Sequence, residues 1–166
     1  MQPYCLEIAC FTLEGALLAQ QAVADRIELC ENPSDGGTTA SYGMLKKVRD
    51  LISIPVFPII RPRGGDFVYS NQEFDVMKYD IEICKQLGYE GVVVGILNEE
   101  GDVDIERTNE LVKLASPMQV TFHRAFDRSS NPLKALEDII QCGCHRILSS
   151  GQFPSVSDGL LLLGQL

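Results

Sequence analysis

The segment that decides the fold runs from residue 91 to 124 and reads GVVVGILNEEGDVDIERTNELVKLASPMQVTFHR. Its two ends, Gly91–Leu97 and Gln119–Arg124, are short apolar runs that we interpret as strands. Between them, Ile105–Ala115 has the pattern of an amphipathic helix, with Asp104 placed to cap its first turn. A strand, a helix and a second strand in this order predict a parallel β-α-β unit.

The same alternation extends over the rest of the chain. We expect further strands at Leu6–Phe11, Arg26–Cys30, Val56–Arg61 and Arg146–Ser149, and further helices at Leu13–Ala24, Tyr42–Ile52, Asn71–Leu87, Pro132–Cys142 and Val156–Leu166. Division of 166 residues among six units gives about 28 each, close to the roughly 31 residues per unit of an eight-unit barrel. The sequence therefore predicts an α/β fold, a TIM-type (β/α) barrel with six of its eight units, in one incomplete domain over residues 1–166.

Composition narrows the class of protein. A formal net charge of −9 argues against nucleic acid or an anionic membrane surface as a partner. The longest apolar run, Leu160–Leu163, is far too short to span a bilayer. Because Glu7 interrupts the first apolar run and no basic segment precedes it, we expect no signal peptide. We therefore expect a cytoplasmic protein whose six cysteines are reduced thiols.

The loops indicate where a site lies. Helix-to-strand loops are short, whereas strand-to-helix loops such as 31–39 and 62–66 are longer and rich in glycine and proline. In parallel β/α folds these longer loops gather at the carboxyl ends of the strands, where active sites are found. Their Gly-Gly pairs can present backbone N–H groups to an anion, although turn chemistry alone also explains them.

Charged residues interrupt the predicted strands, which should otherwise be continuously apolar. The candidate catalytic residues are Glu7, Glu28, Arg61, His123 and Asp127, and the candidate substrate-binding residues are Arg63 and Arg124. Alternation along the strands points the two glutamates inward, and a histidine beside carboxylates titrates near neutrality. A buried ion-pair network that only fixes the strand register is the alternative interpretation.

Two cysteines end adjacent predicted strands at the same rim. Cys10 and Cys30 are therefore the candidate copper ligands, because Cu(I) prefers thiolates and two suffice for linear coordination. Alternation points them to opposite sides of the sheet if both glutamates face inward. The pair Cys142 and Cys144 falls at a helix-to-strand turn, on the face opposite the predicted site.

Several longer motifs closely resemble the CutC family of copper homeostasis proteins. They are LEIACF (6–11), ADRIELC (24–30), GGTTASYG (36–43), IRPRGGDFVY (60–69), TFHRAFD (121–127) and RILSSGQ (146–152). The resemblance implies a cytoplasmic TIM-type barrel linked to copper tolerance, with seven charged motif residues at the barrel mouth: Glu7, Glu28, Arg61, Arg63, His123, Arg124 and Asp127. It also implies that Cys30 serves copper, and that family members continue through a seventh and an eighth strand.

Three functional hypotheses follow. The first is a copper homeostasis protein that binds Cu(I). The second is a barrel enzyme of unknown reaction that acts on a small anionic substrate, and the third is a truncated product without independent function. We also expect self-association as a homo-oligomer, because six units leave the first and sixth strands with unpaired edges.

Overall fold

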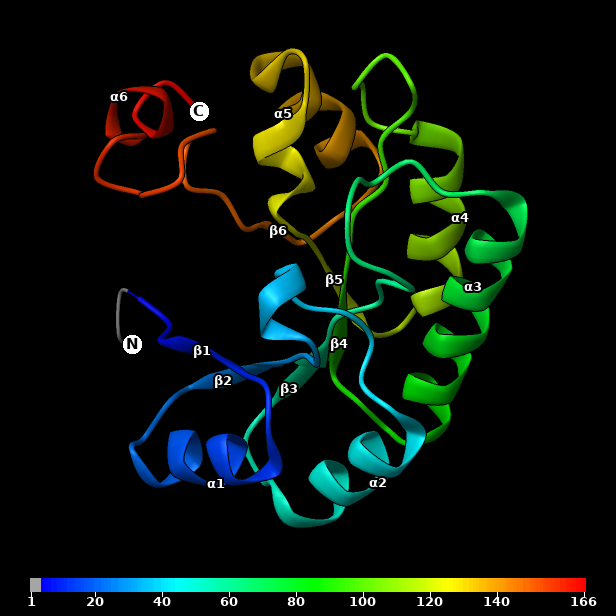
Figure 1. The fold of residues 1–166 in the computed structure, drawn as a ribbon, viewed down its shortest axis with the longest axis vertical. Helices are drawn as coiled ribbons and strands as arrows, with labels where there is room; N and C mark the ends of the chain where they lie inside the picture. Colours follow the sequence, from blue (N-terminus) through cyan, green and yellow to red (C-terminus); the bar gives the residue numbers. More distant parts are fainter. Residues whose placement is uncertain (1–3) are drawn as a thin grey trace.

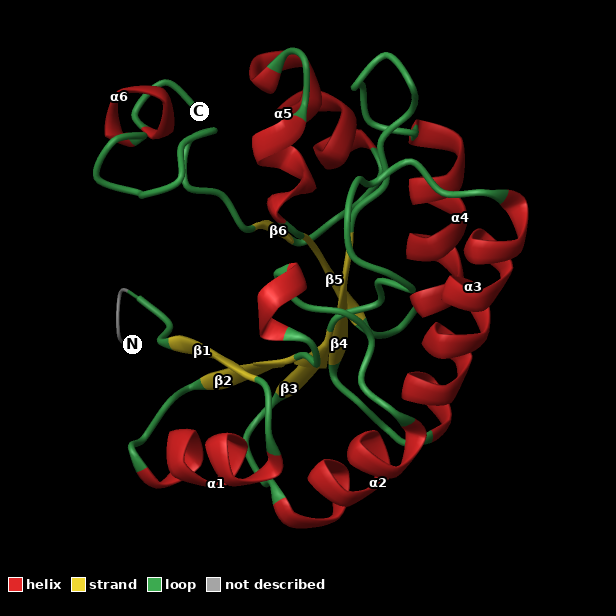
Figure 2. Cartoon of the chain, viewed as in Figure 1, coloured by secondary structure: helices red, strands yellow, loops and turns green. Residues whose placement is uncertain are grey.

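The structure, a computed structural model, describes residues 4–166. Six strands alternate with six α-helices, as Figures 1 and 2 show. The strands are β1 (Glu7–Cys10), β2 (Arg26–Leu29), β3 (Val56–Pro58), β4 (Gly91–Val94), β5 (Gln119–Phe122) and β6 (Arg146–Ile147). The helices are α1 (Leu13–Gln21), α2 (Tyr42–Leu51), α3 (Asn71–Gln86), α4 (Ile105–Ala115), α5 (Pro132–Gln141) and α6 (Leu160–Leu163), with short 3₁₀ helices η1 (Pro33–Asp35) and η2 (Arg124–Arg128).

The strands are parallel and follow one another in sequence order. They form two sheets, β1-β2-β3 and β4-β5-β6. A parallel bridge between Ile59 and Val93 connects the two, and the Ile60 N–H donates to the Val93 carbonyl at 2.8 Å. The predicted α/β fold with parallel strands is confirmed. Within residues 4–166, β1 and β6 each pair on one side only, so these residues do not close a barrel.

Helix ends follow local capping rules. Asp104 accepts a hydrogen bond from the third residue of α4, as predicted, and Asn131 accepts one from the third residue of α5. Gly88 and Gly143 follow α3 and α5 with φ of 76° and 82°, the left-handed conformation that ends many helices. No helix in the described part of the chain has the length and apolar character needed to cross a bilayer.

Every predicted strand and helix except Ile105–Ala115 extends beyond the observed element, and the two at the end of the chain show why. The sixth strand ends at Ile147 rather than Ser149, because the Ser149 hydroxyl donates to Asp127 at 2.6 Å and the backbone turns there. The last helix begins at Leu160 rather than Val156, since a serine-rich turn occupies the preceding residues. In both places, side-chain contacts and turns replace the regular backbone hydrogen bonds of the strand or helix.

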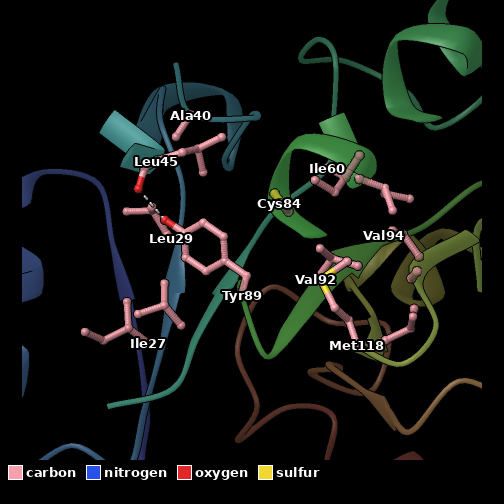
Figure 3. Close-up of a cluster of buried hydrophobic side chains, with 14 of the residues drawn as sticks. Ile27, Leu29, Ala40, Leu45, Ile60, Cys84, Tyr89, Val92, Val94 and Met118 are labelled. Carbon is pink, nitrogen blue, oxygen red and sulfur yellow. Dashed lines mark hydrogen bonds between the residues drawn. The ribbon is translucent and has the colours of Figure 1, made fainter. Parts of the chain in front are cut away.

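The main core lies between the strands and the helices that cover their outer side. Figure 3 shows Ile27, Leu29, Val92 and Val94, which point toward the helices, and the neighbouring Tyr89. The Tyr89 hydroxyl donates to the Leu45 carbonyl of α2 at 2.7 Å, which satisfies the one polar group of this ring. Because alternate strand residues fill this layer, the remaining ones face the opposite side of the sheet.

Candidate functional site

A cavity of about 290 Å³ lies on that opposite side, toward the carboxyl ends of the strands. It is where the loop asymmetry predicts a site. Its lining residues belong to five of the strands, β1, β2, β3, β5 and β6, or to the loops that follow them. They are Ala9, Phe11, Glu28, Cys30, Gly36, Ile59, Arg61, Phe67, His123, Arg124 and Leu148. The cavity therefore brings together four of the charged residues selected from the sequence.

Glu28 lies in the middle of β2, level with Ala9 on β1 and Phe57 on β3. The residue is only 7% exposed. Burial, with a smaller contribution from the Glu7 charge, raises the pKa of Glu28 to about 7, although Arg26 opposes the shift. This carboxyl group therefore gains or loses its proton near neutral pH, as a general acid or base requires.

Arg61 carries a buried positive charge that forms no ion pair with a carboxylate among residues 4–166. Its guanidinium donates instead to three loop carbonyls, those of Asp35 at 2.6 Å, Gly37 at 2.9 Å and Gly65 at 2.8 Å. It also lies 4.8 Å from the centroid of the Phe67 ring. Carbonyl dipoles satisfy Nη1 and Nη2, whereas the buried Nε has no hydrogen-bond partner in residues 4–166. The net charge of the guanidinium is left available to an anion.

His123 is fixed in its neutral form. Its Nδ1 accepts the Ala125 N–H at 3.1 Å, so Nε2 carries the proton. Nε2 is buried and has no hydrogen-bond partner in the described structure. Burial and, to a smaller extent, the Arg61 charge lower the pKa of His123 to about 3. The prediction that this histidine titrates near neutrality is therefore wrong, chiefly because the ring is buried and also because a guanidinium rather than a carboxylate lies beside it.

Arg124 and Asp127 shape the rim. Arg124 lines the cavity and donates to Asp127 at 2.8 Å and to the Ser150 hydroxyl at 2.5 Å. Asp127 also accepts the Ser149 hydroxyl and the Gln152 N–H. Burial raises the pKa of Asp127, but these hydrogen bonds outweigh it and lower the pKa below its ordinary value. Asp127 thus holds the loop after β6 and does not line the main cavity.

Besides Asp127, two further predicted charged residues lie outside the cavity. Glu7 is at the amino-terminal end of β1, level with Arg26, and forms an ion pair with it. Glu7 was predicted to point inward, and its contact with Arg26 fits that prediction. Glu7 lies at the amino-terminal end of β1, however, whereas the cavity lies toward the carboxyl ends of the strands. Arg63 pairs with Glu73 at 2.6 Å and Asp66 at 2.9 Å, and so organises the loop between β3 and α3.

The two predicted copper ligands do not share a face. Cys30 lines the cavity, whereas Cys10 is part of the core on the helix side, as alternation along the two strands requires. The pair therefore does not form a two-thiolate site. Burial, followed by the Glu28 charge, raises the pKa of Cys30 far above its ordinary value, which disfavours the thiolate. Within the described residues, no three His, Cys, Asp or Glu side chains gather as a metal site.

Sequence reasoning missed Phe67 and Gly95. Phe67 lies between Arg61 and His123, with its ring centroid 5.0 Å from that of the imidazole. Gly95 follows β4, and a Cβ there would come within 2.3 Å of the His123 ring. A glycine inside an otherwise apolar strand run is a signal of such close approach. It was present in the sequence as the fifth residue of GVVVGIL.

Fold and cavity together define a parallel β/α protein with a polar ligand-binding cavity at the carboxyl ends of its strands. The sequence profile of the CutC family matches residues 4–166. The chain belongs to the CutC family.

Individual relatives agree. The CutC family protein of Proteus mirabilis is 56% identical over 161 residues, which cover 97% of this chain and 64% of the relative. The crystal structure of a putative copper homeostasis protein CutC from Streptococcus agalactiae matches with a TM-score of 0.91 and 30% identity, over 98% of this chain and 81% of that one. Phosphoenolpyruvate phosphomutase from Streptomyces platensis matches with a TM-score of 0.65 and 17% identity, over 95% of this chain and 64% of that one, which shows a shared fold alone.

Proposed function

We propose that the cavity binds a small anionic molecule and catalyses proton transfer on it. The observation that carries this proposal is the buried Arg61 charge, which has no carboxylate partner in residues 4–166. A buried charge is costly unless it is paired. An anionic ligand supplies that pairing, whereas a purely structural arginine is expected to have a protein carboxylate beside it.

The neighbouring groups suit a carboxylate or carbonyl ligand. The His123 Nε2–H and the Arg61 guanidinium are donors that line one cavity, and such fixed donors stabilise negative charge on oxygen. Glu28 has a pKa of about 7 and can take a proton from the bound molecule and return it. The roles are then anion binding for Arg61, polarisation for His123 and proton transfer for Glu28.

Binding of pyruvate, a carboxylate with an adjacent carbonyl, tests the proposal. Isothermal titration calorimetry measures its affinity, and amide NMR signals show where it binds. Ionised Glu28 repels a carboxylate, so affinity should fall about tenfold from pH 6 to pH 8 as Glu28 loses its proton. Glu28→Gln should remove this pH dependence. Glu82→Gln, a change on the exposed surface of α3, should keep it.

Pyruvate that moves no amide signal around Arg61 and His123 would count against the proposal. So would the same pH dependence in Glu28→Gln as in the unchanged protein, because the titrating group would then lie elsewhere.

A second candidate function is copper binding, which the name of the Streptococcus agalactiae relative suggests. Cys30 is the thiol that supports it, because it lines the cavity beside Glu28 and His123. Thiolates bind the metal, so Cu(I) affinity should rise with pH. Competition with a Cu(I) chelator should show at least a tenfold weakening in Cys30→Ser, and no change in the control Cys10→Ser. Equal affinities in both variants would exclude Cys30 as the ligand.

The chain spans 64–65% of the length of the curated relatives compared. We propose that its six units belong to a TIM-type barrel and that the whole protein acts in the cytoplasm. The similarity to the Streptococcus agalactiae structure supports the first of these proposals, and the reduced state of all six cysteines supports the second.

A further inference from the structure

A second cavity of about 270 Å³ adjoins the first on its outer side. The two share four lining residues, Gly36, Arg61, Phe67 and Arg124, so they lie next to each other. We call the outer cavity the vestibule. It adds Asp35, Gly65, Asp127 and Arg128 to the shared residues, and it is therefore rich in arginine.

Arg128 is the vestibule cation without a partner. Its side chain is exposed, and within residues 4–166 it forms neither an ion pair nor a hydrogen bond. Arg124 differs, because Asp127 and Ser150 hold its guanidinium. Arg128 also lines two further cavities that border the vestibule. Its guanidinium is thus free to bind an oxyanion with two parallel hydrogen bonds.

The loop between β3 and α3 supplies a second set of donors. None of the backbone N–H groups of residues 63–67 donates to an acceptor in the described structure. Gly65, at φ 84°, lines the vestibule, and the Arg63 side chain fixes the loop by donating to the carbonyls of Gly64, Asp66 and Val68. Successive free N–H groups in a loop of this kind form a concave site for anions.

The charges of the vestibule leave a positive excess. Asp127 is neutralised by Arg124 and by hydroxyl and backbone donors. Asp35 packs against Gly64, where its carboxyl group offsets part of the positive charge. Arg61 and Arg128 together therefore outweigh the one remaining carboxylate.

We propose that the vestibule binds the phosphate end of an elongated ligand whose carboxylate end occupies the inner cavity. This inference rests on the proposed function of the inner cavity. The ligand class is a phosphorylated small carboxylic acid. It must be small, because each cavity has room for about ten non-hydrogen atoms at roughly 30 Å³ per water-sized group. Arg128 and the N–H group of Gly65 hold the phosphate.

Three probes test the inference by titration calorimetry and amide NMR: inorganic phosphate, pyruvate and 3-phosphoglycerate. Phosphate should move the Gly65 amide signal, and Arg128→Gln should weaken its binding at least tenfold. Pyruvate affinity should be unchanged in Arg128→Gln. 3-Phosphoglycerate should bind at least tenfold more tightly than either phosphate or pyruvate, and Arg128→Gln should remove the gain over pyruvate. Arg49→Gln, an arginine of α2 paired with Glu90, is the matched control.

The outcomes separate the two proposals. Phosphate binding that leaves the Gly65 signal unmoved, or that survives Arg128→Gln, overturns the vestibule subsite while pyruvate still reports on the inner cavity. 3-Phosphoglycerate that binds no more tightly than phosphate or than pyruvate overturns the claim that one ligand spans both cavities. Pyruvate that fails to bind, with phosphate still dependent on Arg128, overturns the function proposed for the inner cavity.

Discussion

Glu28 is placed where its charge opposes folding. Its pKa rises from 4.5 to about 7 in the folded protein, chiefly because it is buried. The folded state therefore holds this proton more tightly than the unfolded state, and stability falls as pH rises between those two values. At about 1.4 kcal/mol for each tenfold change in proton affinity, the full cost is about 3 kcal/mol above pH 7. A residue retained at such a cost is a candidate for function.

This cost gives a stability prediction. Glu28→Gln keeps the shape of the side chain but carries no charge at any pH. Its free energy of unfolding should exceed that of the unchanged protein by about 3 kcal/mol at pH 8 and be nearly equal to it at pH 4. Urea denaturation at both values checks the prediction. A variant that is less stable at pH 8 would show that an ionised Glu28 has a stabilising partner.

At the scale of the element, β4 and its extension fit the sheet because two glycines leave room for neighbouring rings. A Cβ on Gly91 would come within 2.3 Å of the Phe57 ring, and one on Gly95 would come equally close to His123. Neither glycine has a positive φ. Packing against an aromatic ring, not backbone conformation, is thus what excludes side chains at these two positions.

The corresponding substitutions should separate packing from chain entropy. Gly91→Ala and Gly95→Ala overpack the interior and should each destabilise the fold by about 1–3 kcal/mol. Gly43→Ala on α2 meets nothing within 4 Å and should stabilise it by roughly 0.5–1 kcal/mol, because alanine favours a helix. Thermal denaturation of the three variants checks both signs. A neutral Gly95→Ala would show that the His123 ring has room to move.

Most elements could be predicted from sequence because the rules that specify them are local. Ile105–Ala115 has the predicted bounds, and its cap at Asp104 was predicted as well. Glu28 was placed on the inner face by alternation alone. The ionisation of Glu28 and His123 was not predictable, since it depends first on how deeply each is buried and then on the charge nearby in space: Glu7 near Glu28, and Arg61 beside His123. The free N–H groups of the 63–67 loop likewise depend on where Arg63 reaches.

At the scale of the whole molecule, the sheet has two edges with unpaired backbone groups. In residues 4–166 these edges are β1 and β6. Apolar side chains are also exposed beyond β6, where Leu160 and Leu161 of α6 are 64% and 80% exposed, and on α5, where Leu133 and Ile140 are 54% and 58% exposed. Unpaired edges and contiguous apolar patches are both features that promote association between chains.

We therefore expect the 166-residue chain to self-associate, as inferred from its sequence. Sedimentation velocity should show a mass that rises with protein concentration, since association is governed by mass action. Leu160→Lys with Leu161→Lys should reduce association by removing the apolar face of α6. Val76→Lys, which replaces a half-exposed residue of α3 away from both edges, should not. If the unchanged chain instead sediments as a monomer at all concentrations and melts cooperatively, the exposed edges and the α6 face are tolerated in solution, and six units suffice for a stable fold.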